Sequence, residues 1–166
     1  SVKIFQVKGK TAFAEIESVL EPSPVRIEPP CQYFGKCGGC DFQQMTYEAQ
    51  LAAKLDIIRD SLKRIGKIEF EAEMPIIASP KPCGYRSRAQ WHLETRQKKI
   101  GYFKRNSHDI IDIEHCPILE PVLDDTLKDL RSTVSWDALW ANRAEIEAAC
   151  ASDGEVSLYS PEIMEP

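Results

Sequence analysis

The sequence predicts an α+β fold in which antiparallel strands pack with helices. Three observations support this class. Residues 85–95 alternate between polar and apolar side chains, the pattern of a strand with one buried face. Apolar residues recur at spacings of four and three from Leu51 to Ile65, which places them on one side of a helix. The expected elements follow one another as strands, helix, strands, helices and strand, an order typical of α+β proteins.

The expected strands are short and fall in three regions. Residues 1–20 are expected to form a β-hairpin with its turn at Lys8-Gly9-Lys10. Residues 21–30 contain four prolines and predict an extended linker, because each proline disfavours helix in the residue before it. The remaining strands are expected at 85–95, 100–103 and 110–113, as an antiparallel meander, and at 156–159.

Three helices are expected. The first begins after Thr46, which can cap a helix N-terminus, and ends near Gly66. We expect its apolar stripe to be part of the core rather than a coiled-coil seam. Residues 123–130 carry three leucines on one helix face and predict the second helix. Residues 138–149 are expected to form the third.

The composition is that of a globular protein. The 166 residues are 43% apolar and 28% charged, enough for one ordinary domain or two small ones. No apolar run approaches the roughly 18–20 residues that a membrane helix needs, and no signal-peptide pattern opens the chain. We therefore expect a cytoplasmic protein without a membrane partner.

The charge is unevenly distributed along the chain. The formal net charge is −5, yet residues 81–108 carry eight Lys and Arg against Glu94 alone. Residues 109–166 carry three Lys and Arg against fourteen Asp and Glu. Because electrostatic fields act locally, the basic block is more informative than the total. It predicts either a surface for nucleic-acid phosphates or a solvated lysine-rich turn, and charge alone leaves both open.

The cysteines are clustered. Cys31, Cys37 and Cys40 lie within ten residues on a glycine-rich stretch, and Cys116 follows far along the chain just before a proline. A tight cluster without a signal peptide indicates metal or redox chemistry in a reducing compartment. Three local thiolates and a remote one before proline are typical of a 4Fe–4S cluster. A zinc site with four cysteine ligands is the main alternative.

No catalytic group can be assigned from the residues. Four cysteine ligands leave no open coordination position, which argues against Lewis-acid catalysis. Cys83 and Cys150 have no activating neighbour in sequence and are expected to be inert. Asp124-Asp125 is most simply the acidic first turn of a helix.

Three segments resemble the RNA uracil-5-methyltransferase family. They are CQYFGKCGGCDFQQMTYEAQLAAKLDII, PCGYRSRAQWHLE and GYFKRNSHDIIDIEHCPIL. The resemblance is to the bacterial 23S ribosomal RNA branch, whose members carry an N-terminal TRAM domain and a 4Fe–4S cluster. It implies that Cys31, Cys37, Cys40 and Cys116 are the cluster ligands. It also implies that residues 1–28 are part of a TRAM barrel with its linker, and that residues 29–166 form the iron–sulfur and central RNA-binding domain.

The family's catalytic parts have no counterpart in these residues. We find no glycine-rich loop for S-adenosylmethionine, no nucleophilic cysteine after a DPPR-type segment and no downstream catalytic glutamate. The resemblance therefore implies an RNA (uracil-5-)-methyltransferase in which this chain is the RNA-recognition portion, inactive alone. Its expected partners are RNA, ribosomal rather than transfer RNA, and the methyltransferase domain of the same protein.

The expected RNA surface is the polar face of the strand at 85–95 together with the turns after it. Phosphate contacts are predicted for Arg86, Arg88, His92, Lys98, Lys99, Lys104 and Arg105. Tyr102 or Phe103 could stack on bases, whereas Tyr85 and Trp91 are expected in the core. Two alternatives stay open: a zinc-stabilised RNA- or protein-binding module without enzymatic role, and a redox sensor that gates binding through its cluster.

Overall fold

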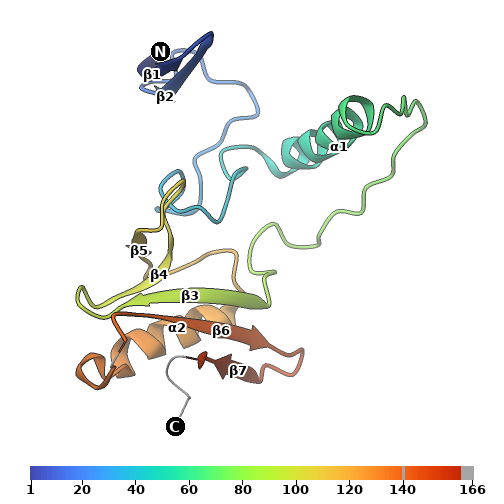
Figure 1. Cartoon of the computed structure of the whole chain (residues 1–166). Coiled ribbons are helices and arrows are strands. Elements are labelled where there is room, and N and C mark those ends of the chain that lie inside the picture. Colours follow the sequence, from blue (N-terminus) through green and yellow to red (C-terminus); the bar gives the residue numbers. More distant parts are fainter. Residues whose placement is uncertain (140, 162–166) are drawn as a thin grey trace.

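Five antiparallel strands form the main sheet, in the order β5-β4-β3-β6-β7 (Figure 1). The computed structural model describes residues 1–139 and 141–161. The strands are β3 (Arg88–Glu94), β4 (Lys99–Phe103), β5 (Ile110–Asp112), β6 (Arg143–Cys150) and β7 (Val156–Tyr159). The predicted α+β class, the meander and the last strand are therefore confirmed.

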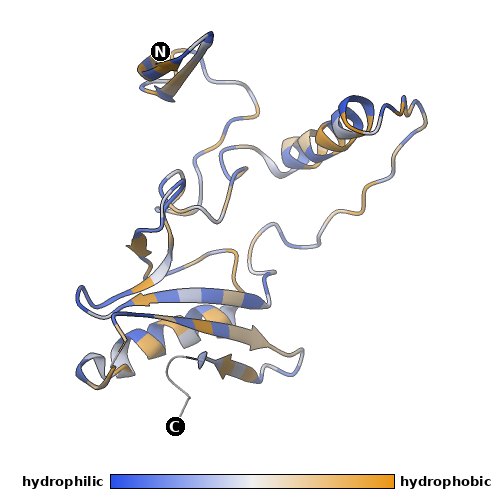
Figure 2. Ribbon diagram, viewed as in Figure 1, coloured by the Kyte–Doolittle hydropathy of each residue, from blue (hydrophilic) through white to orange (hydrophobic). Residues whose placement is uncertain are grey.

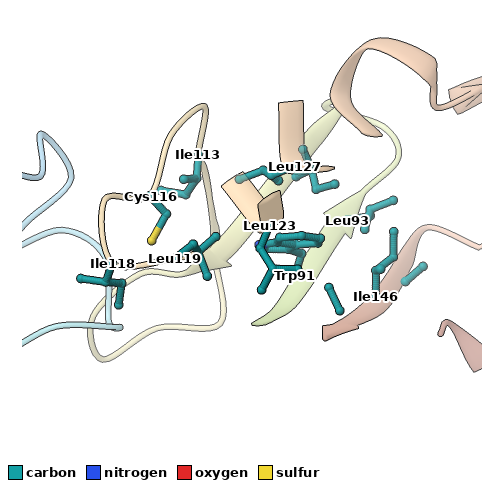
Figure 3. Packing of buried hydrophobic residues seen from close by; sticks show 12 residues of the cluster. Trp91, Leu93, Ile113, Cys116, Ile118, Leu119, Leu123, Leu127 and Ile146 are labelled. Atoms are coloured by element: carbon teal, nitrogen blue, oxygen red, sulfur yellow. The ribbon is translucent and has the colours of Figure 1, made fainter. Parts of the chain in front are cut away.

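The core lies between one face of this sheet and the helix α2 (Pro121–Thr133). The alternation in β3 points Trp91 and Leu93 toward α2, whose Leu123 and Leu127 meet them (Figure 3). All four side chains are fully buried. Burial of each contributes roughly 1.5–3 kcal/mol relative to exposure, so this layer is the main source of stability.

The predicted helix over residues 138–149 is wrong. A short 3₁₀ turn, η1 (Trp136–Ala138), is followed by the strand β6, which pairs with the whole of β3. Alanine and glutamate favour helix, but β3 would otherwise expose its backbone N–H and C=O groups on that side. The alternation of buried Ala144, Ile146 and Ala148 fits the strand, so tertiary pairing overrides the local propensity.

The N-terminal hairpin is confirmed as β1 (Val2–Lys8) and β2 (Thr11–Ile16). Gly9 forms the turn with a positive φ of 59°, a conformation that glycine adopts without steric cost. Every residue of both strands is exposed, including the apolar ones. Two strands alone are only marginally stable in water.

The predicted first helix is confirmed as α1 (Tyr47–Arg64), but its place in the core is not. The Thr46 hydroxyl accepts a hydrogen bond from the Ala49 N–H at 3.4 Å and caps the helix. No residue of α1 is buried, and Figure 1 shows the helix apart from the main sheet. No helix in the described ranges is long and apolar enough to cross a membrane.

Gly101 in β4 is required for the close packing of β4 and β5. A Cβ at this buried position would overlap the carbonyl oxygen of Ile111 and lie 2.8 Å from Cγ1 of Ile113. We expect Gly101→Ala to lower the free energy of unfolding by about 2–3 kcal/mol, because β5 must move away. Urea unfolding monitored by tryptophan fluorescence measures the change.

Ser135→Ala, at an exposed position outside the sheet, is the matched control and should stay within about 0.5 kcal/mol of the parent chain. Equal stability of the Gly101→Ala chain and this control would show that β4 and β5 do not approach so closely.

Candidate metal centre and nucleic-acid interface

The four predicted cysteine ligands line a single cavity of about 40 Å³. Cys31, Cys37 and Cys40 belong to the loop between the linker and α1, and Cys116 belongs to the segment between β5 and α2. The walls are largely apolar, formed by Tyr33, Phe34, Tyr102, Ile113 and Ile118. The fold thus brings together sulfur atoms that are far apart in the sequence.

The loop is held against the end of β4 by backbone hydrogen bonds. The N–H of Gly38 donates to the carbonyl of Phe103 at 3.0 Å, and the N–H of Arg105 donates to the carbonyl of Lys36 at 2.8 Å. A Cβ on Gly38 would lie 3.3 Å from that Phe103 oxygen, so the glycine permits this close approach. The result is a short bridge between Cys37 and Lys104 that adds the loop to the sheet.

Two amide groups also hydrogen-bond the sulfur atoms. The N–H of Gly39 donates to Sγ of Cys37 at 3.4 Å. The side chain of Gln43 hydrogen-bonds Cys40. Hydrogen bonds of this kind are among the means by which proteins tune iron–sulfur centres.

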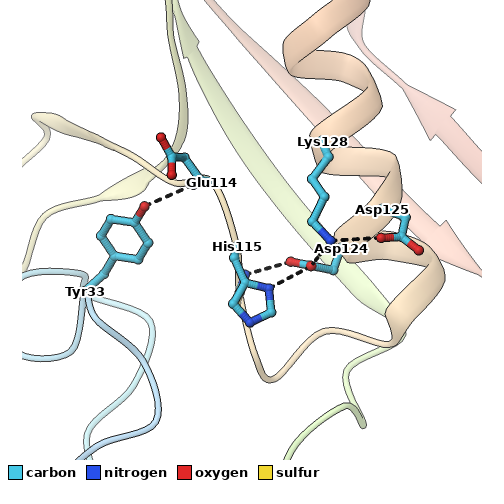
Figure 4. Close-up of polar contacts among 7 residues, drawn as sticks. Tyr33, Glu114, His115, Asp124, Asp125 and Lys128 are labelled. Atoms are coloured by element: carbon cyan, nitrogen blue, oxygen red, sulfur yellow. Dashed lines mark hydrogen bonds and ion pairs between the residues drawn. The ribbon is translucent and has the colours of Figure 1, made fainter.

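Asp124 fixes the segment that carries Cys116. Its Oδ1 accepts the backbone N–H of Cys116 at 2.7 Å, and its Oδ2 lies 2.7 Å from Nδ1 of His115 and 2.9 Å from Nζ of Lys128 (Figure 4). The carboxylate is 5% exposed. Burial opposes its ionisation, but these hydrogen bonds outweigh burial and hold the pKa of Asp124 below its usual value. Asp124 is thus more than the acidic first turn expected from sequence.

Burial raises the pKa of the Cys116 thiol to about 11, and the neighbouring Cys40 and Cys31 add to the increase. Burial also raises the pKa values of Cys37 and Cys40. Thiolate ligands need a metal cation beside them to ionise in such surroundings. Within residues 1–139 and 141–161, no group of three or more His, Cys, Asp or Glu side chains is arranged to hold a single metal ion.

The predicted RNA-binding residues form two groups rather than one surface. Lys98 and Lys99 lie at the turn between β3 and β4, whereas Lys104 and Arg105 follow β4 at its other end. Five residues of extended strand separate the groups by roughly 16 Å. The first residue of β3, Arg88, lies at the end near the cysteine loop, because β3 and β4 run antiparallel.

Arg105 and Lys104 also have structural partners. The Arg105 guanidinium donates to the carbonyl oxygen of Cys40 at 3.2 Å and forms an ion pair with Asp41. Lys104 pairs with Asp109 at 3.6 Å. Arg86 is one of the residues that line the cysteine cavity, and it forms no ion pair among the described residues. Arg105 therefore holds the cysteine loop in place.

His92 and the aromatic residues are placed differently from expectation. The His92 ring stacks on Phe103 with centroids 3.8 Å apart, and its side chain is 12% exposed. Burial lowers the pKa of His92, although Glu145 at 3.1 Å partly offsets this effect. The Tyr102 hydroxyl accepts a hydrogen bond from Nε1 of Trp91 at 3.2 Å, so Tyr102 belongs to the interior. Tyr85, expected in the core, is instead 50% exposed.

The open face of the sheet also carries carboxylates that sequence reasoning missed. Glu145 and Glu147 of β6 pair in register with His92 and Gln90 of β3. The sequence alone does not place them on this face, because it predicts a helix where β6 lies. A groove of about 420 Å³ on this face is lined by Arg86, Arg88, Gln90, Glu147 and Tyr159, among others. The face is therefore of mixed charge, with Arg86 and Arg88 at the end near the cysteines and Arg143, paired in register with Glu94, at the other end.

Comparisons with known proteins identify relatives, although no family model matches. The chain is 36% identical over 135 residues to an RNA methyltransferase of Thermosynechococcus vestitus. This match covers 80% of this chain and 30% of that protein. It is 35% identical over 132 residues to a 23S rRNA (uracil(1939)-C(5))-methyltransferase of Pseudomonas putida. That match covers 77% of this chain and 29% of the relative. The corresponding protein of Pectobacterium atrosepticum is 31% identical over 92% of this chain.

The importance of Asp124 for the Cys116 segment can be tested by Asp124→Asn. The amide would turn an N–H toward His115 or Lys128, where the carboxylate accepts hydrogen bonds. We expect the free energy of unfolding of the metal-free chain to fall by about 2 kcal/mol in urea unfolding, as for loss of hydrogen bonds to a buried charge. Asp125→Asn, at the exposed neighbouring position, should change it by less than about 0.5 kcal/mol. Equal losses in the two variants would argue against a special role for Asp124.

Proposed function

We propose that this chain is the iron–sulfur RNA-recognition portion of an S-adenosylmethionine-dependent RNA (uracil-5-)-methyltransferase. The proposal starts from its homology to a segment of RNA methyltransferases. The chain spans about 30% of the length of the relatives it matches. The observation that carries the proposal is the meeting of four cysteines at one cavity in a chain with such relatives. Because two of these relatives are named for uracil 1939 of 23S rRNA, we infer ribosomal RNA as the substrate and rRNA processing as the role.

The cysteine set favours a 4Fe–4S cluster over a zinc ion. Zinc sites with four cysteine ligands more often combine two C-x2-C pairs. Here only Cys37 and Cys40 form such a pair, and the other two cysteines that line the cavity stand separately in the sequence. All-thiolate donors, apolar walls and N–H groups directed at sulfur fit a polynuclear iron–sulfur cluster. When bound, the cluster would supply a covalent cross-link and a redox-active centre.

RNA binding is supported by the position of the unpaired basic side chains. Arg86 and Arg88 lie beside the cysteine cavity, and Lys98 and Lys99 lie at the far turn of the same hairpin. The six residue steps of β3 put these two cationic groups roughly 20 Å apart, which suits phosphates several nucleotides apart on a single strand. Tyr85, half-exposed next to Arg86, is the aromatic side chain best placed for a base.

The remaining parts of the proposal concern organisation. Residues 1–28 are proposed to be a TRAM-like segment with its linker, and residues 29–166 the iron–sulfur and RNA-binding domain. Methyl transfer is assigned to a methyltransferase domain of the same protein, which holds S-adenosylmethionine. The chain is expected to act in the cytoplasm, where thiols stay reduced.

The metal centre can be tested by metal analysis of the anaerobically purified chain. We expect about four irons and four sulfides per chain, and their loss in Cys116→Ser, because one ligand is removed. Cys150→Ser, a half-buried cysteine outside the cavity, is the control and should retain full iron content. One zinc per chain, with no iron uptake on reconstitution, would favour the zinc-stabilised binding module instead.

RNA recognition can be tested by fluorescence anisotropy with a 23S rRNA hairpin that contains uracil 1939. We expect affinity to fall with salt with a log–log slope of roughly −3 to −4, as for about five neutralised phosphates. Lys98→Glu/Lys99→Glu should weaken binding at least tenfold, whereas Lys54→Glu/Lys63→Glu on α1 should not. Unchanged affinity in the first variant would remove the far turn from the interface, and a salt-independent signal would contradict phosphate binding altogether.

A further inference from the structure

Helix α1 carries an apolar stripe that the described residues cover only in part. Leu51, Leu55 and Leu62 are only half-buried, and the remaining stripe residues Ile58 and Ile65 are exposed, Ile65 to 83%. Figure 2 shows apolar and polar residues interleaved along this helix, which stands away from the sheet. Most of the stability of a helix in a protein comes from packing of its apolar face, so the exposed part of the α1 stripe favours a partner that covers it.

The segment after α1 extends the same surface. Residues 66–80 return to the sheet without forming a helix or strand, and they expose Ile68, Phe70, Ile76 and Ile77. Ile77 is 96% exposed. The far end of the segment is tied to the start of the helix, because the Ser79 N–H donates to the Tyr47 hydroxyl at 2.7 Å. We call α1 and residues 66–80 together the α1 arm.

The opposite side of α1 has the features of a water-facing surface. Asp60 and Arg64 form an ion pair at 2.6 Å, and Asp56 pairs with Arg59 at 3.4 Å. Pairs at these spacings stabilise an exposed helix face. The arm therefore has one face suited to solvent and one apolar face, and exposed apolar surface of this extent marks an interaction site.

The relatives indicate what covers the apolar face. A match of 135 residues within a chain of 166 necessarily includes α1, so the helix belongs to the region shared with the methyltransferases. Those proteins are about three times as long as the matched region. We propose that the apolar face of the α1 arm is the docking surface for the methyltransferase domain of the same protein. This inference rests on the proposed function and identifies the contact between its two parts.

The cysteine loop would then orient that domain. Cys40 is followed after five residues by Thr46, the cap of α1. The backbone of this connection is fixed to the linker, since Thr46 N–H donates to the carbonyl of Val25 at 2.9 Å and Ile27 N–H donates to that of Gln44 at 3.0 Å. A domain docked on α1 is thus positioned relative to the metal centre and, through it, to the sheet that carries the basic residues.

Hydrogen exchange measured by mass spectrometry tests the docking. In the 166-residue chain, sedimentation should show a monomer, and the amides of α1 should exchange at least 100-fold faster than those of β3 and β6. In the full-length methyltransferase of Thermosynechococcus vestitus, the segment aligned with α1 should be protected. Aspartate at the position aligned with Leu55 should abolish this protection, whereas aspartate at the position aligned with exposed Ala52 should preserve it.

Three results would overturn the inference. The first is slow amide exchange of α1 in the monomeric chain, and the second is fast amide exchange of the aligned segment in the full-length relative. The third is a dimer of this chain that Leu55→Asp dissociates, which would assign the apolar face to a second copy. RNA affinity of the Leu55→Asp chain is measured alongside and should equal that of the parent. Loss of RNA binding by both chains would contradict the proposed function, and the exchange data would still decide the docking.

Discussion

The structure depends on the attachment of the cysteine loop to the end of β4 and to the segment before α2. The bridge between Cys37 and Lys104 and the hydrogen bond from Cys116 to Asp124 bring four sulfur atoms to one cavity. A cross-link at this point closes a loop of about 85 residues, which would stabilise the chain by roughly 4–5 kcal/mol if it acts as a disulfide does. The linker, α1 and the sheet all meet here, so their relative positions follow from this one junction.

Several charged side chains in this region stabilise the fold through ion pairs and hydrogen bonds. Arg105 is used to hold Cys40 and Asp41, and Asp124 is used to hold Cys116. Arg131 of α2 pairs with Asp112 of β5 and ties that helix to the sheet. Arg86 and Lys98 form no ion pair among the described residues, and our proposal assigns such side chains to RNA. In that proposal the eight cations of the basic block are divided between holding the fold and binding RNA.

Much of the fold could be predicted because alternation and spacing are local signals. The strand at Trp91 and Leu93, the meander and α2 follow from such patterns. β6 could not be recognised, since alanine and glutamate favour helix and only the pairing with β3 overrides them. The exposure of the α1 stripe could not be predicted either. The period of a stripe indicates a face that packs against something, but it does not say which partner covers that face.

The candidate site was predicted unevenly for the same reason. The spacing groups Cys31, Cys37 and Cys40, and the proline after Cys116 together with the family resemblance adds the fourth cysteine. These four line one cavity. Asp124 gave only the signal of a helix start, and its contact with Cys116 needs the tertiary fold. The separation of the basic residues into two groups could be predicted only once the length of β4 was known. The stacking of His92 on Phe103 could be predicted only from the register of β3 and β4.

X-ray absorption at the iron edge of the anaerobically purified chain tests the central claim most directly, which is that the four cysteines bind one iron–sulfur cluster. The account predicts iron surrounded by sulfur, with a clear iron–iron scattering contribution that disappears when Cys31 is replaced by serine. A chain that contains zinc coordinated by four sulfur atoms, or iron without a neighbouring iron, would contradict it.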